Sequence, residues 1–290
     1  MDEGMMIDRC YVEITNVCNL NCDFCPKHQR AGRQMTLEEF DLVTDRIRDR
    51  VLFLYFHLMG EPLLHPLLPQ FIAIARQKGF KTVLTSNGTL LHRAMALQES
   101  LPHKIQLSLH SHESNGKGVL ADYISEVMRF SIAAAEKGTC MVLRLWNQGG
   151  REEENDEVMR LLAEYVPEPW TTRPDGYRLR ENLYLEFDRK FVWPEVVAVE
   201  EDGALPQVHC KALMKQIGVL ADGSLVPCCL DHNGDVTLGN IFTQSLDEIL
   251  ASPRAVAMID GFQHHMATES LCQHCESALI NNSFRGKARH

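Results

Sequence analysis

The 290-residue sequence predicts an α/β fold, in which six parallel strands with outer helices form a partial (β/α)6 barrel and a small C-terminal domain follows. Between about Arg9 and Phe187, short runs rich in β-branched and aromatic residues alternate with longer runs of helical periodicity. This alternation is typical of repeated β/α units around a parallel sheet. After Trp193 the alternation stops, which indicates that a second structural unit begins.

Six runs are predicted as the parallel strands, and their neighbours carry helix signals. Thr36 and Glu39 have the spacing of a capping box, and Gly79 and Gly138 stand where the end of a helix favours a left-handed residue. The segment from Glu152 to Glu164 predicts a charged amphipathic surface helix. In such folds the chemistry lies at the C-terminal ends of the strands. The strands are CYVEIT from Cys10, VLFLYFHL from Val51, KTVLT from Lys81, KIQLSL from Lys104, CMVLRLW from Cys140 and LYLEF from Leu183.

The C-terminal part is predicted to be a separate domain. We expect one domain over residues 1–200 and a second over residues 205–290, joined by the linker-like stretch VVAVEEDGALPQV. In the second domain, Ile217 to Pro227 predicts two short strands around an Asp-Gly turn. Ser245, with Glu248 three residues later, predicts the capped start of a short helix.

Composition narrows the class of function. The formal net charge of -10 disfavours nucleic acid as a partner, because binding to phosphates needs clustered Lys and Arg. The N-terminus has no apolar signal region, and the purest apolar run, Val51 to Phe56, is too short to span a bilayer, so we expect a cytoplasmic protein without a membrane partner. Ten cysteines in that compartment indicate metal or redox chemistry rather than disulfides. Cys10 and Cys140 lie in apolar strands and are predicted as small core residues.

Three cysteines lie close together after the first strand. Cys18, Cys22 and Cys25 form a Cys-x3-Cys-x2-Cys spacing in the loop where a β/α fold places its active site. Three thiolates can hold a cubane of four irons while one iron keeps no protein ligand. From the residues alone, a zinc site with His28 as the fourth ligand is the alternative.

The segment CNLNCDFC, with its aromatic Phe24, resembles the motif of the radical S-adenosylmethionine (SAM) superfamily. The resemblance implies a partial (β/α)6 radical SAM barrel, a [4Fe-4S] cluster whose open iron binds SAM, and an external electron donor such as flavodoxin or ferredoxin. It also implies that the reduced cluster splits SAM to methionine and a 5'-deoxyadenosyl radical, which takes a hydrogen atom from the substrate.

Further segments that resemble motifs of this family follow in order along the chain. MGEPL after the second strand resembles the family's Gly-Glu-Pro motif, whose residues would line the amino group of SAM. Asn87 is either a SAM contact or a loop Asn in a left-handed conformation. Arg144 lies among apolar neighbours in a strand, where an arginine needs a carboxylate as partner. In the family, a strand arginine at this place often contacts the carboxylate of SAM. Ser108 resembles a ribose-binding position, although His110 follows where relatives have an Asp-Gly turn. The implied SAM contacts are Phe24, Gly60, Glu61, Pro62, Asn87, Ser108 and Arg144.

A second cysteine group lies near the C-terminus. Cys210 and Cys228 are separated by seventeen residues, and Cys272 and Cys275 form a Cys-x2-Cys pair. This layout resembles the SPASM and twitch extensions of radical SAM enzymes, and four thiolates permit one auxiliary [4Fe-4S] cluster. A zinc knuckle is the structural alternative. Cys228 keeps the family's spacing from a preceding glycine, whereas the role of its neighbour Cys229 stays open.

The cysteine layout resembles that of twitch-bearing dehydrogenases most closely, so we expect the oxidation of a small molecule. Asp231, three residues after Cys228, is then a candidate base for the departing proton, or else a solvated loop aspartate. The alternative reaction is maturation of a ribosomally made peptide by crosslink, thioether or epimer formation. The chain starts shortly before its first strand, so we expect no N-terminal peptide-recognition domain. The alternative from another functional class is a sensor protein that binds an iron-sulfur cluster or zinc and catalyses no reaction.

Overall fold

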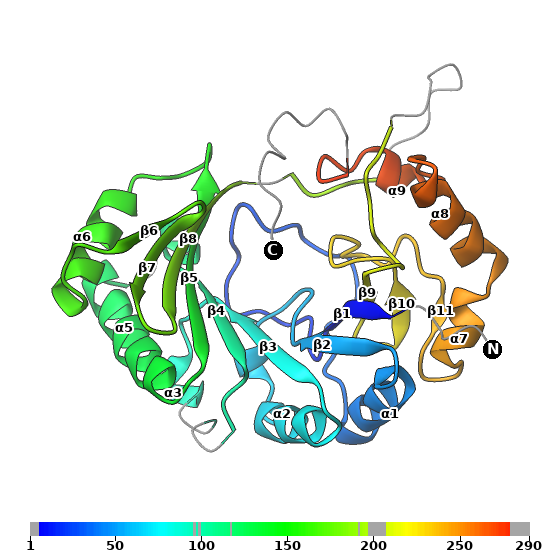
Figure 1. Ribbon diagram of the computed structural model, residues 1–290, viewed down its shortest axis with the longest axis horizontal. Coiled ribbons are helices and arrows are strands. Elements are labelled where there is room, and N and C mark those ends of the chain that lie inside the picture. The colour runs from blue at the N-terminus through cyan, green and yellow to red at the C-terminus, as the bar shows by residue number, and fades with distance from the viewer. Residues whose placement is uncertain are drawn as a thin grey trace.

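One curved sheet of eleven strands organises the molecule, and the six predicted strands form its parallel middle (Figure 1). The computed structural model describes residues 6–94, 97, 100–116, 118–190, 192–196 and 207–278. In the sheet the six strands lie side by side in chain order, each parallel to its neighbours. They are β1 (Ile7–Val12), β2 (Val51–Tyr55), β3 (Lys81–Ser86), β4 (Lys104–Ser108), β5 (Cys140–Gln148) and β8 (Leu183–Arg189).

The first two strands end earlier than the sequence patterns predicted. β1 stops at Val12 rather than at Thr15, because the chain from Ile14 onward pairs with Met35 through a 2.8 Å hydrogen bond and leaves the parallel ladder. β2 stops at Tyr55 rather than at Leu58. The N–H groups of Glu13 and Phe56 still bond the neighbouring strands at 2.9 Å, and the residues after them build the loops of the site.

Helices cover the outer surface of the arc (Figure 1). The capping box of Thr36 and Glu39 is confirmed at the start of the first helix. Gly79 and Gly138 have φ values of +90° and +89°, as expected after helix ends. The helix predicted from Glu152 begins three residues later. The elements are α1 (Leu37–Ile47), η1 (Pro62–Leu64), α2 (Leu68–Gln77), α3 (Leu91–Ala94), α4 (Ser111–Asn115), α5 (Leu120–Glu136) and α6 (Asn155–Tyr165).

The sheet continues beyond both ends of the parallel run, which the sequence did not predict. At one end β7 (Gly176–Arg180) and β6 (Thr171–Arg173) add to β8 in antiparallel fashion. At the other end the predicted C-terminal hairpin is present as β9 (Gln216–Val219) and β10 (Ser224–Val226), with β11 (Gly239–Asn240) beyond it.

Strand β9 pairs with β1 in parallel, so the C-terminal hairpin extends the same sheet instead of standing apart from it. The helix capped by Ser245 and Glu248 is confirmed as α7 (Leu246–Leu250), and α8 (Pro253–Gln263) and α9 (Ser270–Gln273) follow. Most of the expected linker, residues 197–206, lies outside the described residues, and so does the expected domain boundary.

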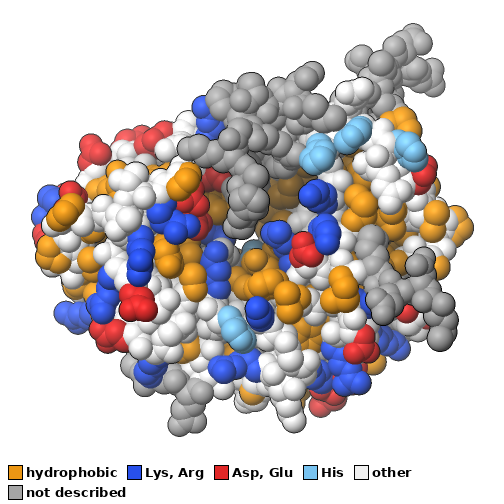
Figure 2. Space-filling view, viewed as in Figure 1, with side chains coloured by type: hydrophobic (Ala, Val, Ile, Leu, Met, Phe, Trp, Pro, Cys, Tyr) orange, Lys and Arg blue, Asp and Glu red, His pale blue; other side chains and the backbone are white. Residues whose placement is uncertain are grey.

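The two faces of the sheet differ, because successive side chains of a strand point to opposite sides. Cys10 and Leu54 face outward into the main core beneath the helices, where both are fully buried. Cys140 is only half-buried, since it opens β5 beside Lys104, so the prediction that it is a core residue holds less well. Tyr11 faces the other way, toward the centre of the arc. Figure 2 shows apolar side chains together with Lys and Arg around that centre.

Candidate active site

The three cysteines of the first constellation lie in the loop that follows β1, at the C-terminal ends of the parallel strands. Cys18 is exposed, whereas Cys22 and Cys25 are half-buried. Burial raises the pKa of all three thiols, and that of Cys25 rises to about 12 through burial and then the charges of Cys22 and Cys18. The charge of Cys18 thus acts on Cys22, and the charges of both act on Cys25.

Amide groups point at these sulfurs. The backbone N–H of Leu20 lies 3.5 Å from the Cys18 sulfur, and the side-chain amide of Asn115 donates to the Cys22 sulfur over 3.1 Å. The Asn87 amide lies 4.0 Å from the Cys18 sulfur. Hydrogen bonds of this kind stabilise thiolates and are a feature of iron-sulfur ligation, so the donor set fits a cluster.

His28, the fourth ligand of the zinc alternative, has one ring nitrogen bonded to the loop backbone. Its Nε2 lies 3.0 Å from the carbonyl oxygen of Asn16, while its Nδ1 is buried and has no hydrogen-bond partner among the described residues. Across the residues that the structure describes, no three His, Cys, Asp or Glu side chains are placed to hold a single metal ion.

The Gly-Glu-Pro segment passes directly over the end of β1. Gly60 has φ +78°, and a Cβ there would lie 2.3 Å from the carbonyl oxygen of Thr15, so only glycine fits. Glu61 is 1% exposed and Pro62 opens η1. The motif therefore positions backbone against the cysteine loop.

The Glu61 carboxylate connects the loops that follow β2 and β3. Its oxygens accept the N–H groups of Leu63 at 3.0 Å and Asn87 at 2.8 Å. Burial raises its pKa to about 6, although these hydrogen bonds partly oppose the shift. A hydrogen bond with the Ser86 side chain opposes the shift as well.

Asn87 is held from several sides. Its side-chain amide donates to Asn19 over 3.0 Å, and its backbone carbonyl accepts the hydroxyl groups of Ser111 at 3.1 Å and Tyr123 at 2.9 Å. These contacts fix the residue beside Cys18, where the sequence placed a SAM contact.

Arg144 and Ser108 are register partners on β5 and β4 and face the same side of the sheet. The Arg144 guanidinium lies 3.9 Å above the Trp146 ring, a cation–π contact. Burial, opposed in part by a hydrogen bond to the Arg144 carbonyl, lowers the pKa of His110 to about 4. The His110 ring lies 4.8 Å from that of Phe24. A small pocket in this region is lined by Asp23, Phe24, His110, Ser114, Trp146, Asn147, Arg151 and Lys190.

The cysteines of the second group, near the C-terminus, also influence one another. Burial raises the pKa of Cys228 and of Cys272, and the charge of Cys210 raises both further. Cys275 contributes in the same way to Cys272, and the backbone N–H of Ala212 lies 3.4 Å from the Cys210 sulfur. These charges connect Cys210, Cys228, Cys272 and Cys275 electrostatically.

Comparison with known proteins decides the family. A family model for the radical SAM superfamily matches residues 12–177, more than half of the chain. This chain belongs to the radical SAM superfamily. A second model, for the SPASM iron-sulfur cluster-binding domain, matches residues 210–276. A radical SAM core with this domain carries a SAM-binding [4Fe-4S] cluster and an auxiliary iron-sulfur cluster.

Solved radical SAM structures share the fold. BtrN, solved in an open conformation and in complex with AdoMet and 2-DOIA, is 16% identical; in its open form the TM-score is 0.58, over 95% of this chain and 94% of BtrN. Streptococcus suis SuiB bound to the precursor peptide SuiA is 16% identical, with a TM-score of 0.63 over 94% of this chain and 72% of SuiB.

Sequence relatives match over shorter stretches. A "Probable GTP 3',8-cyclase" of Pyrobaculum aerophilum is 26% identical over 167 residues, which cover 55% of this chain and 54% of the relative. The chain spans about half the length, or less, of the curated relatives it matches. No helix among the described residues is long and apolar enough to cross a membrane.

Within this radical SAM fold, Asp231 is a buried loop residue and not the solvated one that the sequence offered as an alternative. Its side chain is 0% exposed and accepts the backbone N–H groups of Gly234, Asp235 and Val236 at 3.0, 2.8 and 2.9 Å. Burial raises its pKa. The carboxylate therefore shapes the loop after Cys228, and its part in proton transfer stays a prediction.

Cys229 packs against a different set of side chains from Cys228, although its charge raises the pKa of the Cys228 thiol. It joins a small apolar cluster on the inner side of the sheet, formed around Tyr11, Leu58 and Met59 and also touched by Cys25. Burial raises its pKa to about 11, while a hydrogen bond with the Tyr11 hydroxyl opposes the shift. It thus lies on the face that also borders the first cysteine group.

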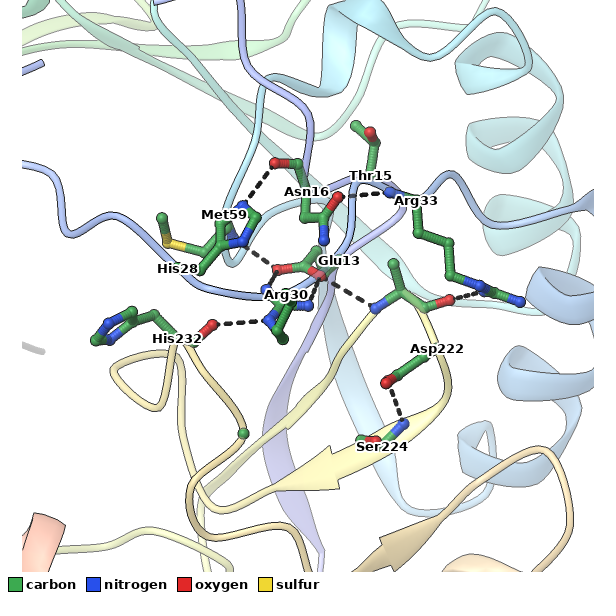
Figure 3. Close-up of polar contacts among 12 residues, drawn as sticks. Glu13, Thr15, Asn16, His28, Arg30, Arg33, Met59, Asp222, Ser224 and His232 are labelled. Atoms are coloured by element: carbon green, nitrogen blue, oxygen red, sulfur yellow. Dashed lines mark hydrogen bonds and ion pairs between the residues drawn. The ribbon is translucent and has the colours of Figure 1, made fainter. Parts of the chain in front are cut away.

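The residue that sequence reasoning missed is Glu13, at the end of β1 (Figure 3). Its fully buried carboxylate binds both terminal nitrogens of Arg30, at 2.6 and 2.7 Å. It also accepts the N–H groups of Met59 at 3.2 Å and Ala221 at 3.1 Å. A glutamate among the apolar residues of CYVEIT was the signal, since a buried carboxylate needs partners.

Proposed function

We propose that Cys18, Cys22 and Cys25 hold the SAM-binding cluster of this radical SAM enzyme. The observation that carries the proposal is the grouping of three mutually interacting thiols at the end of β1, with the Gly60 backbone closed over the same strand end. When bound, the cluster supplies the electron that cleaves SAM and generates the hydrogen-abstracting radical.

The chain's own residues around this loop suit the parts of SAM. Glu61 offers a carboxylate to an ammonium, and Arg144 offers a guanidinium to a carboxylate. Phe24, beside His110, supplies an apolar wall next to the loop. We assign Phe24, Gly60, Glu61, Pro62, Asn87, Ser108 and Arg144 to SAM on this basis, as the sequence predicted.

For the auxiliary cluster we propose Cys210, Cys228, Cys272 and Cys275 as ligands. Their mutual influence on pKa supports the assignment. Cys229 also raises the pKa of Cys228, and we leave it out because Cys228 is the one that keeps the family's spacing from the preceding glycine. The pairing of β9 with β1 joins this domain to the SAM-binding core through one sheet.

The reaction we propose is dehydrogenation of a small molecule. After a hydrogen atom leaves the substrate, a second electron would pass to the auxiliary cluster and a proton to a base. The cysteine layout, which resembles that of twitch-bearing dehydrogenases, favours this reaction, and the likeness to BtrN over nearly all of both chains supports the shared fold. Peptide maturation is the second candidate, favoured by the likeness to SuiB.

The test is anaerobic reconstitution followed by iron and 5'-deoxyadenosine assays. Wild type should hold about eight irons, and Cys272→Ala/Cys275→Ala about four with SAM cleavage retained. Cys18→Ala, Cys22→Ala or Cys25→Ala should each abolish 5'-deoxyadenosine formation, whereas the matched Cys140→Ala should change neither value. SAM cleavage in any of the three loop variants would refute the assignment.

Substrate class needs a separate experiment. Deuterium transfer into 5'-deoxyadenosine should be followed with deuterated polyols and with peptides, and the product's oxidation level determined. A product two electrons more oxidised than the substrate supports the dehydrogenase; a product at the substrate's own level removes it.

A further inference from the structure

The short helix α4 contacts the loop that carries the first three cysteines. The Ser114 hydroxyl donates to the Asp23 carboxylate, and the backbone N–H of Asn21 donates to the Asn115 side-chain oxygen over 3.0 Å. The Asn115 amide nitrogen then lies 3.1 Å from the Cys22 sulfur. Nothing in the sequence motif indicated this contact, since 93 positions separate the two residues.

The orientation of the Asn115 amide follows from its partners. Its oxygen faces a backbone N–H, which can only donate, so this end must be the acceptor. Its nitrogen therefore faces the Cys22 sulfur, and it also donates to the Ser111 carbonyl over 2.7 Å. Two hydrogen-bonded neighbours thus hold the donor at the sulfur.

This contact is shorter than the two contacts described for the Cys18 sulfur. The Leu20 N–H lies 3.5 Å and the Asn87 amide 4.0 Å from the Cys18 sulfur. A hydrogen bond to a ligand sulfur stabilises negative charge on it, and reduction of a cluster adds negative charge. A donor at this position therefore favours the reduced cluster.

We propose that Asn115 is a positioning residue that sets the reduction potential of the SAM-binding cluster through its amide contact with Cys22. The inference rests on the proposed ligand role of Cys22. Through this contact α4 makes the cluster easier to reduce and so raises the fraction able to cleave SAM at a given donor potential.

The experiment is a potentiometric titration of the reconstituted full chain, followed by electron paramagnetic resonance. Asn115→Leu keeps a similar side-chain volume without the donor and should move the potential of the SAM-binding cluster to a more negative value, while the auxiliary cluster keeps its own. Ser114→Ala is the matched control, because it removes another contact between α4 and the loop without touching a sulfur. It should leave both potentials unchanged.

Two results would overturn the inference: an unchanged potential in Asn115→Leu, or an equal shift in Ser114→Ala, which would indicate general loosening of the loop. If Asn115→Leu does not load the cluster, Asn115→Ala decides, because it removes the donor at Cys22 without adding bulk or charge. A Cys22→Ala variant that still binds a full SAM-binding cluster would instead refute the ligand assignment itself.

Discussion

Glu13 and Arg30 form a two-pronged ion pair in which the carboxylate is 0% and the guanidinium side chain 15% exposed. Arg30 follows the cysteine motif, and its Nε also donates to the His232 carbonyl at 3.0 Å, in the loop after Cys228. The ion pair therefore connects both cysteine regions to the end of one strand (Figure 3).

Glu13→Gln should destabilise the fold, because it leaves Arg30 without its charged partner. Breaking a buried pair in this way costs about 3 to 5 kcal/mol. Denaturant unfolding of the anaerobic protein would measure the loss, and iron content should fall at both sites. The control is Asp8→Asn in the same strand, whose carboxylate meets Lys215 at the surface and whose loss should cost about 0 to 1 kcal/mol.

Gly60→Ala should abolish SAM cleavage, because the added Cβ would collide with the Thr15 carbonyl at the end of β1. Gly79→Ala is matched to it: that glycine has φ +90° but nothing within 4 Å of a Cβ, so its cost should stay near 1 kcal/mol. Formation of 5'-deoxyadenosine and unfolding free energy would be measured for both. Equal effects in the two variants would mean that the close approach of Gly60 is unimportant.

Arg144→Ala should raise the SAM concentration needed for half-maximal cleavage. A charge-assisted contact is worth about 1.5 to 3 kcal/mol, or roughly 10- to 150-fold in affinity. Equilibrium binding of SAM to the reconstituted protein would show the change, and Lys104→Ala on the neighbouring strand is the control. Unaltered SAM affinity would assign Arg144 to the substrate or to the sheet.

Glu61 predicts a pH dependence of stability. Burial raises its folded-state pKa from 4.5 to about 6, so between these values the folded protein binds the proton more tightly than the unfolded chain. This group's contribution to stability is therefore present below about pH 4.5 and is lost as pH rises through about 6. Unfolding curves across this range should show a smaller decline in Glu61→Gln than in wild type, whereas Glu38→Gln on the surface should behave as wild type.

Asp231→Asn separates two roles for this residue. The three backbone N–H groups around the carboxylate favour a structural role, since an amide nitrogen in that place would face donors. We expect a loss of about 1 to 3 kcal/mol in stability and reduced auxiliary iron. A variant with full iron and normal hydrogen transfer but no oxidised product would establish Asp231 as the base instead.

Local patterns in the sequence were enough to predict the six parallel strands and both cysteine groups. Strand periodicity is set by neighbouring residues, and the loop cysteines stand within one short segment, Cys18 to Cys25. The capping boxes at Thr36 and Ser245 are equally local, because each joins residues three positions apart. Such features need no knowledge of how the chain folds back on itself.

The tertiary structure alone decided the contacts that join distant segments. The Ala221 N–H meets Glu13 across 208 positions, and Asn115 meets Cys22 across 93. The pairing of β9 with β1 belongs to the same class. A single buried glutamate, or an asparagine at the end of a short helix, carries no periodic signal. Its partner is set only when the strands curve and bring distant segments together. Burial then requires those polar groups to be paired. The cysteines can therefore be identified from the sequence, whereas the residues that position their loops can be identified only from the folded structure.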